Sequence, residues 1–201
     1  MTSCLAIHGS LAADRELHVL VPMRRVIAVV VVPWLVLFAI VACDSRARAA
    51  FAYRNEPSRW VVPVAGVLGR DIESTWGAAR SGGRKHQGAD IFAPKGTAVV
   101  AATDGVVLSI GLDRLGGNVV YLLGEGLTVQ YYAHLDSWEP GLQEGQHVKA
   151  GAALGRVGNT GNAATTPSHL HFGVSRVKPI RLRRHRFDPL DVLRDAETIP
   201  R

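Results

Sequence analysis

Short apolar runs separated by turns rich in Gly, Pro and Asp limit this chain to a mainly β fold. Several runs alternate apolar with polar residues, which is the period of a half-buried strand, and helical periodicity is scarce. The expected strands are Val61–Val64, Gly88–Phe92, Ala98–Ala102, Val106–Ile110, Asn118–Leu123, Leu127–His134, Ala153–Val157 and His169–Ser175. Apart from an N-terminal apolar segment, a helix is expected only at Pro189–Arg194.

These runs predict a single, mostly antiparallel β domain, a sandwich or a barrel-like hybrid. The segment from Trp60 to Val174, roughly 115 residues, is long enough to bury one sizeable core. No internal repeat divides it. The Gly-rich segments Gly111–Asn118 and Gly158–Ser168 are expected to form groove walls, where a ligand backbone approaches closely.

Three separate segments carry side chains that bind transition metals. They are His86-Gln87-Gly88-Ala89-Asp90, Tyr132-Ala133-His134-Leu135 and His169-Leu170-His171, and they hold four of the eight histidines of the chain. Imidazole and carboxylate suit Zn²⁺, which in catalytic sites takes three protein ligands and a water. Each segment alone also fits a surface pair or a satisfied core-edge histidine. Their joint occurrence favours metal-assisted hydrolysis.

The spacings inside these segments predict local geometry. On a strand, His169 and His171 project from one face, while Leu170 and Phe172 point into the core. A straight strand would separate His86 from Asp90 by about 13 Å, so the chain is expected to bend at Gly88, which permits unusual dihedrals. A helix would also bring positions i and i+4 together, but the Gly and the following Ile91-Phe92-Ala93-Pro94 favour a turn that leads into a strand.

The three segments, in this order, resemble the lysostaphin-type (LytM-like) zinc endopeptidases, which hydrolyse peptidoglycan. That family has an HxxxD motif, a separate histidine in a Tyr-Ala-His-Leu-like strand and a late HxH motif. The resemblance covers about Trp60 to Val174. Further matching segments are Gly83–His86, Ala93–Thr97, Ala102–Val107, Gly145–Val148 and Gly158–Gly161.

The resemblance implies His86, Asp90 and His171 as ligands of one Zn²⁺ per domain, and His134 and His169 as catalytic histidines that do not bind the metal. It also implies a lysostaphin-like duplicated hybrid motif and cleavage of peptide stems or cross-links of bacterial peptidoglycan. Relatives cut glycine bridges or bonds to D-amino acids, and the bond is left open here. An HExxH glutamate is absent from the sequence, so proton transfer falls to the histidines, whose individual roles stay open.

A rival interpretation is a LytM-like module that binds the wall or activates an amidase without cutting. Some relatives have lost ligands and serve as such activators, whereas this chain keeps all five site residues. Three further residues are expected in the substrate groove: Trp76, where the family pattern suggests a smaller aromatic, Asn118 and Thr160.

An export segment is expected near the N-terminus. Residues Val26 to Cys43 are uncharged and almost wholly apolar, and Met23 and the basic pair Arg24-Arg25 precede them. Translation from Met23 would make residues 1–22 an atypical extension or an artefact of the assigned start. Three outcomes are open: lipidation of Cys43, cleavage after Ala47-Arg48-Ala49, or an uncleaved membrane anchor. The predicted organisation is therefore signal or anchor 23–43, polar linker 44–59, peptidase domain 60–176 and basic tail 177–201.

The charge of the chain bears on its partners. The net charge of +6 and the isoelectric point of about 9.8 invite a nucleic-acid interpretation, but no nucleic-acid-binding motif is present. Much of the excess lies in Arg181, Arg183, Arg184 and Arg186, which suit an anionic wall or membrane or simply a solvated tail. We therefore expect an exported, periplasmic, membrane-tethered envelope protein. Its expected partners are peptidoglycan, the membrane through a lipid or the N-terminal helix, and other envelope proteins, but not nucleic acid.

Overall fold

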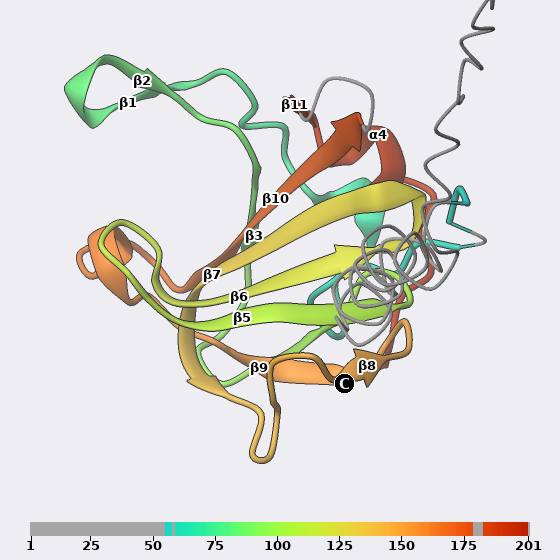
Figure 1. Ribbon diagram of the computed structural model, residues 1–201. Helices are drawn as coiled ribbons and strands as arrows, with labels where there is room; N and C mark the ends of the chain where they lie inside the picture. Colours follow the sequence, from blue (N-terminus) through green and yellow to red (C-terminus); the bar gives the residue numbers. More distant parts are fainter. Residues whose placement is uncertain (1–54, 58, 179–182, 201) are drawn as a thin grey trace, which may run out of the picture. The chain divides into compact units, whose positions relative to one another are not determined.

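The computed structural model describes residues 55–57, 59–178 and 183–200 (Figure 1). The predicted signal or anchor, Cys43 and most of the linker lie outside the described residues. Within them, no helix is long and apolar enough to cross a membrane. The strands are β1 Ala79–Arg80, β2 Arg84–Lys85, β3 Ala89–Phe92, β4 Ala98–Val100, β5 Gly105–Asp113, β6 Gly117–Gly124, β7 Thr128–Trp138, β8 His147–Val148, β9 Ala153–Val157, β10 His169–Lys178 and β11 Arg183–Phe187. The helices are η2 Gly69–Asp71, η3 Ser81–Gly83, η4 Glu125–Leu127, η5 Gly161–Ala163 and α4 Leu190–Leu193.

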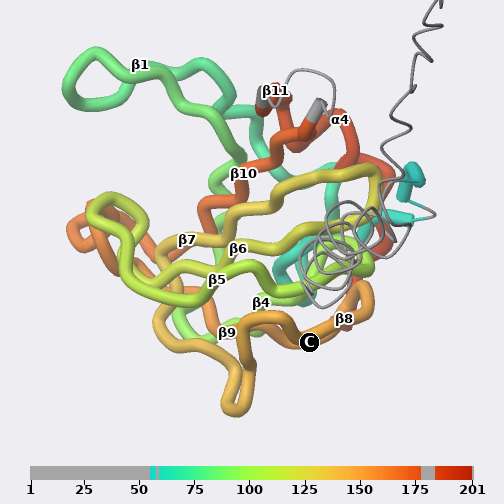
Figure 2. Tube along the Cα trace, viewed as in Figure 1, coloured from blue at the N-terminus to red at the C-terminus, as the bar shows by residue number. Residues whose placement is uncertain are grey.

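Within the described residues, nine strands form one sheet in which every strand pair is antiparallel. Its main path runs β11-β10-β7-β6-β5-β8, with β3 paired to β10 and β9 paired to both β4 and β7. Because β11 and β8 end the path without pairing to each other, the sheet does not close into a barrel. The predicted class, mainly β and antiparallel, is confirmed. Figures 1 and 2 show the neighbouring strands β10, β7, β6 and β5 and the separate β1–β2 hairpin.

Successive side chains of β10 point alternately into the core and toward the site. Leu170, Phe172 and Val174 are buried in the main hydrophobic cluster, where the ring of Phe172 lies 5.1 Å from that of Tyr132. His169 and His171 alternate with them and project from the opposite face, because successive strand residues point to opposite sides. The predicted orientation of the HxH segment is therefore confirmed.

The sheet and the core continue past the domain boundary predicted at residue 176. Strand β11 pairs with β10 from Val174↔Phe187 to Lys178↔Arg183. Leu190 and Leu193 of α4 join the main core, and the Glu197 N–H donates to the carbonyl of Trp60. Most of residues 183–200 therefore belong to the domain. Strand β11 cannot be recognised from the sequence, because it is an edge strand whose residues 184–186 are exposed and its sequence shows no apolar alternation. The helix predicted at Pro189–Arg194 is present as α4.

Two other elements differ from the sequence expectation. Val61 and Val64 form only isolated bridges, to Glu197 and Val99, instead of a strand. The β1–β2 hairpin was not predicted, because its four strand residues are exposed and include no apolar pattern.

Candidate active site

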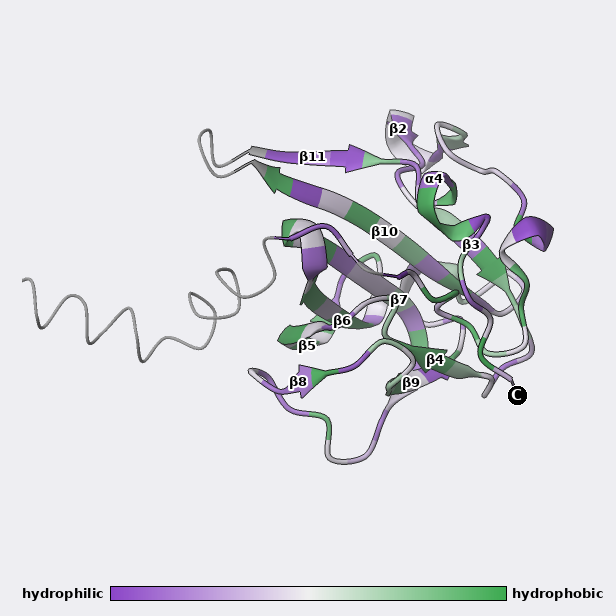
Figure 3. Cartoon of the chain, turned by 90° about the vertical axis from the view of Figure 1, so that its right-hand side faces the viewer, coloured by the Kyte–Doolittle hydropathy of each residue, from purple (hydrophilic) through white to green (hydrophobic). Residues whose placement is uncertain are grey.

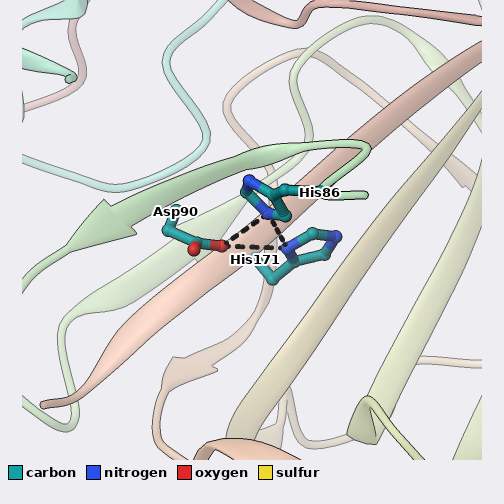
Figure 4. A group of neighbouring side chains, drawn as sticks. All are labelled: His86, Asp90 and His171. Atoms are coloured by element: carbon teal, nitrogen blue, oxygen red, sulfur yellow. Dashed lines mark hydrogen bonds and ion pairs between the residues drawn. The ribbon is translucent and has the colours of Figure 1, made fainter. Parts of the chain in front are cut away.

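Three potential metal ligands, two on neighbouring strands and one on the connection before them, converge at one point (Figure 4). Asp90 on β3 lies directly opposite His171 on β10, and His86 precedes β3 by three residues. The distances are 2.9 Å between His171 Nδ1 and Asp90 Oδ1, 2.9 Å between His86 Nε2 and His171 Nδ1, and 3.1 Å between His86 Nε2 and Asp90 Oδ1. Antiparallel pairing therefore brings together residues that are more than 80 positions apart.

The chain bends at Gly88, as the spacing of His86 and Asp90 predicts. The reason for glycine is different from the expected one, since Gly88 is not among the residues with positive φ. A Cβ at this position would lie 2.6 Å from Cε1 and 2.7 Å from Nε2 of His171, and 2.7 Å from the carbonyl oxygen of Phe172. Glycine is therefore required because the His171 ring packs against the backbone.

This contact predicts that Gly88→Ala impairs the metal centre more than it impairs the fold. The added methyl group has to displace the His171 ring, which lies on the site face of β10 and outside the core. It also presses on the Phe172 carbonyl, so a smaller loss of stability is expected beside the effect on the metal centre. We expect zinc affinity to fall by about 10–100-fold, the range seen when the support of a ligand is lost. Competitive zinc titration of the purified protein measures the effect. Gly77→Ala is not a usable control because φ there is +78°, whereas Gly111→Ala has open space and ordinary φ. A Gly88→Ala protein with unchanged zinc affinity would contradict the prediction.

Partners outside the triad orient two of its members. The Nδ1 of His86 lies 2.9 Å from the carbonyl oxygen of Thr75, which leaves Nε2 toward the cluster. The guanidinium of Arg80 donates to Oδ2 of Asp90, so Oδ1 is the oxygen that faces the histidines. Burial acts to raise the pKa of Asp90, but hydrogen bonds from His171 and His86 outweigh it and hold that pKa below its usual range. The carboxylate is therefore ionised at neutral pH.

The triad fits a zinc ion by its donor set. Two imidazole nitrogens and one carboxylate oxygen are ligands typical of catalytic zinc. Tetrahedral bonds of 2.0–2.1 Å separate neighbouring ligand atoms by about 3.3 Å, and the three atoms are already 2.9–3.1 Å apart. Small outward movements would therefore accommodate the ion. Metal-binding histidines and carboxylates are usually oriented by further hydrogen bonds. Here His86 donates to the Thr75 carbonyl, and Asp90 accepts from Arg80.

Two further histidines face this triad. The ring of His169 lies 5.0 Å from the ring of His134, and Nε2 of His169 lies 3.9 Å from Asp90 Oδ1. Nδ1 of His169 lies 2.8 Å from the Pro167 carbonyl, and Nδ1 of His134 lies 2.8 Å from the Thr160 carbonyl. Since both backbone contacts use Nδ1, Nε2 is the ring nitrogen that each histidine retains for chemistry. The structure brings all five predicted histidine and aspartate residues together.

His134 reaches the site through a bulge in β7. The pairing of β6 with β7 passes from Asn118↔Leu135 to Val120↔Tyr132, so β7 contains one extra residue there. His134 itself has φ of +64°, which is unusual for a residue with a side chain. Such strain of about 1–2 kcal/mol is tolerated where surrounding contacts fix the conformation. Regular alternation would place His134 on the core face with Tyr132, and the bulge turns it toward His169 instead.

The comparisons with known proteins agree with this geometry. The model of the family described as peptidase family M23 matches residues 84–189, which is more than half of the chain. The chain belongs to peptidase family M23. An M23 relative from Bacillus subtilis, named L-Ala–D-Glu endopeptidase, is 41% identical over 108 residues, which are 50% of this chain and 33% of that protein. This chain therefore spans about a third of the length of that relative.

Solved structures give the same family fold. The catalytic domain of lysostaphin from Staphylococcus simulans matches with a TM-score of 0.53 and 30% identity, covering 63% of this chain and 93% of that one. A zinc-containing peptidase from Vibrio cholerae matches with a TM-score of 0.53 and 26% identity, covering 71% of this chain and 41% of that one. The resemblance expected from the histidine segments is therefore confirmed, and the His-Asp-His group of this M23 domain fits the zinc that the family uses.

Three residues expected in the substrate groove do not line it. The Asn118 side chain donates to the carbonyls of Leu135 and Asp136, and the Thr160 hydroxyl donates to the carbonyl of Leu135. Both residues therefore secure the β7 bulge beside His134. Trp76 is half-buried and also lies outside the groove lining of this M23 domain. The polar groups of Asn118 and Thr160 are thus bonded to the backbone, and the substrate contacts expected of these two residues and of Trp76 stay predictions.

A groove beside the metal centre contains residues that sequence reasoning missed. Its floor includes Tyr131, whose ring lies 5.9 Å from that of His171, and Tyr121, whose ring lies 4.7 Å from that of Tyr131. Arg80, which also lines the groove, donates a hydrogen bond to Asp90. The strand pairing would have identified the tyrosines. Tyr131 of β7 lies opposite Gly173, two residues after His171, and Tyr121 of β6 lies opposite Tyr131, so all three share the face of the HxH histidines. Arg80 carries no comparable signal, because its position depends on the β1–β2 hairpin.

Proposed function

We propose that this M23 protein is a zinc-dependent endopeptidase that hydrolyses peptide bonds in the stems or cross-links of bacterial peptidoglycan. The observation that carries the proposal is the meeting of His86, Asp90 and His171 on the wall of a groove, with two more histidines directed toward them. The Bacillus subtilis relative, named for its cleavage of the L-Ala–D-Glu bond, supports the substrate class.

The proposed zinc ligands are His86 Nε2, Asp90 Oδ1 and His171 Nδ1. When bound, zinc supplies Lewis acidity, which polarises the peptide carbonyl and acidifies the attacking water. Nearly complete burial of His86, whose side chain is 3% exposed, limits its motion. The Arg80–Asp90 contact occupies the second carboxylate oxygen, so Asp90 offers the ion a single oxygen.

His134 and His169 are the proposed proton-transfer groups. Burial lowers the pKa of His134 to about 4, so its imidazole is neutral at pH 7. Its Nδ1–H donates to the Thr160 carbonyl, which leaves a lone pair on Nε2. One imidazole takes the proton of the attacking water as the C–O bond forms, and the pair returns a proton to the nitrogen as the C–N bond breaks. Once one imidazole has taken that proton, its Nε2–H can also donate a hydrogen bond to the developing oxyanion.

A substrate of this kind requires an extracytoplasmic location, and we propose that the protein acts in the bacterial envelope. We further propose that the apolar segment from Val26 to Cys43 exports it and tethers it to the membrane, through lipid on Cys43 or as an anchor. The apolar character of this segment and the basic pair before it support the proposal.

Digestion of purified peptidoglycan by the zinc-loaded full chain tests the proposed activity. We expect soluble muropeptides, identified by mass analysis, and their loss on addition of a chelator. His86→Ala is expected to be inactive, while the control variant His147→Ala, altered at the exposed residue of β8 and outside the groove lining, is expected to keep its activity. Stoichiometric zinc binding with no cleavage of any wall preparation would favour the rival, a non-hydrolytic wall-binding or activating module.

A further inference from the structure

Basic side chains dominate the charged lining of the groove. Among the described residues, they are Arg80, Arg84, Lys85, Arg184 and Arg186. The acidic residues in the lining, Asp90 and Asp113, are both engaged. Asp90 belongs to the metal centre, and Asp113 Oδ1 accepts the backbone N–H groups of Leu115 and Gly116. The groove therefore presents a net positive lining to whatever enters it.

Two arginines of β11, Arg184 and Arg186, lie on the same face as the metal centre. Residues directly opposite each other in an antiparallel pair share a face, and Arg186 is opposite Ser175 while Arg184 is opposite Val177. Ser175 and Val177 continue the series that begins at His169 and His171, two residues at a time. Figure 3 shows β11 as a hydrophilic strand beside β10. What looks like a basic tail in the sequence is thus one wall of the groove.

Arg186 extends this wall back toward the metal centre. Its partner Ser175 is four residues from His171, which corresponds to about 13 Å along the strand. The Arg186 guanidinium nevertheless donates to the side-chain oxygen of Gln87, the neighbour of His86. Its charge therefore lies close to the segment that supplies a proposed zinc ligand. On the β1–β2 hairpin, which Figure 1 shows standing apart from the sheet, Arg84 and Lys85 add charge to the same lining.

The floor between these basic side chains is uncharged. Gly173 has no side chain, which leaves space above this part of the floor. A Cβ at this position would fit, with ordinary contacts to Tyr131 at 3.6–3.7 Å and to the carbonyl of Gln87. Tyr121, Tyr131 and Ser175 complete it. A peptide on this floor would meet guanidinium groups at its sides, and guanidinium binds carboxylate through two parallel hydrogen bonds.

We propose that Arg184 and Arg186 form a carboxylate-binding wall, and that the protein selects peptides with a free carboxylate a few residues from the scissile bond over neutral glycine bridges. This inference rests on the proposed function and specifies its substrate class. A peptidoglycan stem whose γ-linked D-glutamate keeps its α-carboxylate has the required chemistry, and the same stem amidated at that carboxylate lacks it. Arg84 and Lys85 contribute long-range attraction.

Binding of matched peptides to the zinc-loaded full chain tests the inference without relying on turnover. His169→Ala serves as the slow-cutting background, and calorimetry compares three peptides that all end in a C-terminal amide: the stem tetrapeptide, the same stem amidated at the D-glutamate α-carboxylate, and pentaglycine. We expect the acidic stem to bind about tenfold more tightly than the other two, since a charge-assisted hydrogen bond at an exposed site is screened. The advantage is expected to shrink as salt is added.

The double substitution Arg184→Gln with Arg186→Gln should abolish the preference and leave zinc content unchanged. Arg194→Gln, altered at an exposed arginine after α4 and outside the groove lining, is the matched control and should retain it. Equal binding of acidic and amidated stems, no binding of either, or an unchanged preference in the double variant would overturn the inference. A preserved preference without cleavage of any wall peptide by the unsubstituted chain would support this inference while refuting the proposed hydrolysis.

Discussion

His171→Ala is expected to remove zinc from the protein and to reduce muropeptide release to background. Nδ1 of His171 lies 2.9 Å from both Asp90 Oδ1 and His86 Nε2, so it is within ligand distance of both other members of the proposed group. Two remaining ligands cannot supply the three that catalytic zinc sites use. We expect the zinc affinity to fall by more than ~100-fold, beyond the usual cost of losing only a supporting group. Metal content after dialysis and wall digestion measure the two effects.

His185→Ala is the matched control for this substitution. His185 is an exposed histidine on β11, opposite Arg176, and lies outside the groove lining. It should retain both zinc and activity. Thermal unfolding of both variants in the presence of a chelator separates metal loss from misfolding, because His171 lies outside the hydrophobic core. A His171→Ala protein that keeps one tightly bound zinc per chain would refute the proposed ligand set.

His134→Ala and His169→Ala are expected to keep zinc but lose turnover by about 10²–10⁴-fold, the usual contribution of a general acid or base. Their Nδ1 atoms contact backbone carbonyls of Thr160 and Pro167, and neither residue belongs to the close triad. The loss should appear mainly in kcat, because these groups act on protons in the transition state. Steady-state cleavage of a defined stem peptide, with parallel metal analysis, provides the measurement.

The contrast between the two kinds of substitution separates the proposed roles. Metal loss in His134→Ala equal to that in His171→Ala would show that His134 is a ligand or that the site collapses without it. Asn118→Ala distinguishes these two cases, since it removes the side-chain bonds that hold the β7 bulge while leaving the imidazole in place. A selective fall in kcat in Asn118→Ala, with zinc retained, is the result expected of a positioning residue.

Much of the metal centre could be predicted from local spacing. The HxH segment requires only strand alternation, so the shared face of His169 and His171 follows from their positions. The bend between His86 and Asp90 follows from the short distance that a common ion imposes. The position of His134 does not follow in this way, because one extra residue in β7 and a φ of +64° reverse the alternation there. A bulge of this kind depends on the partner strand and on the Gly116 and Thr160 carbonyls.

The amino-acid sequence determined the mainly β class, the zinc-type donor set and the family resemblance, because these depend on residue type and short-range period. Only the tertiary structure decided that β11 is a groove wall, that Asn118 and Thr160 bind backbone, and that Gly88 makes room for the His171 ring. Each of these facts is a contact between segments far apart in the chain. Antiparallel pairing and close packing fix such contacts, and neither is encoded in the period of a single segment.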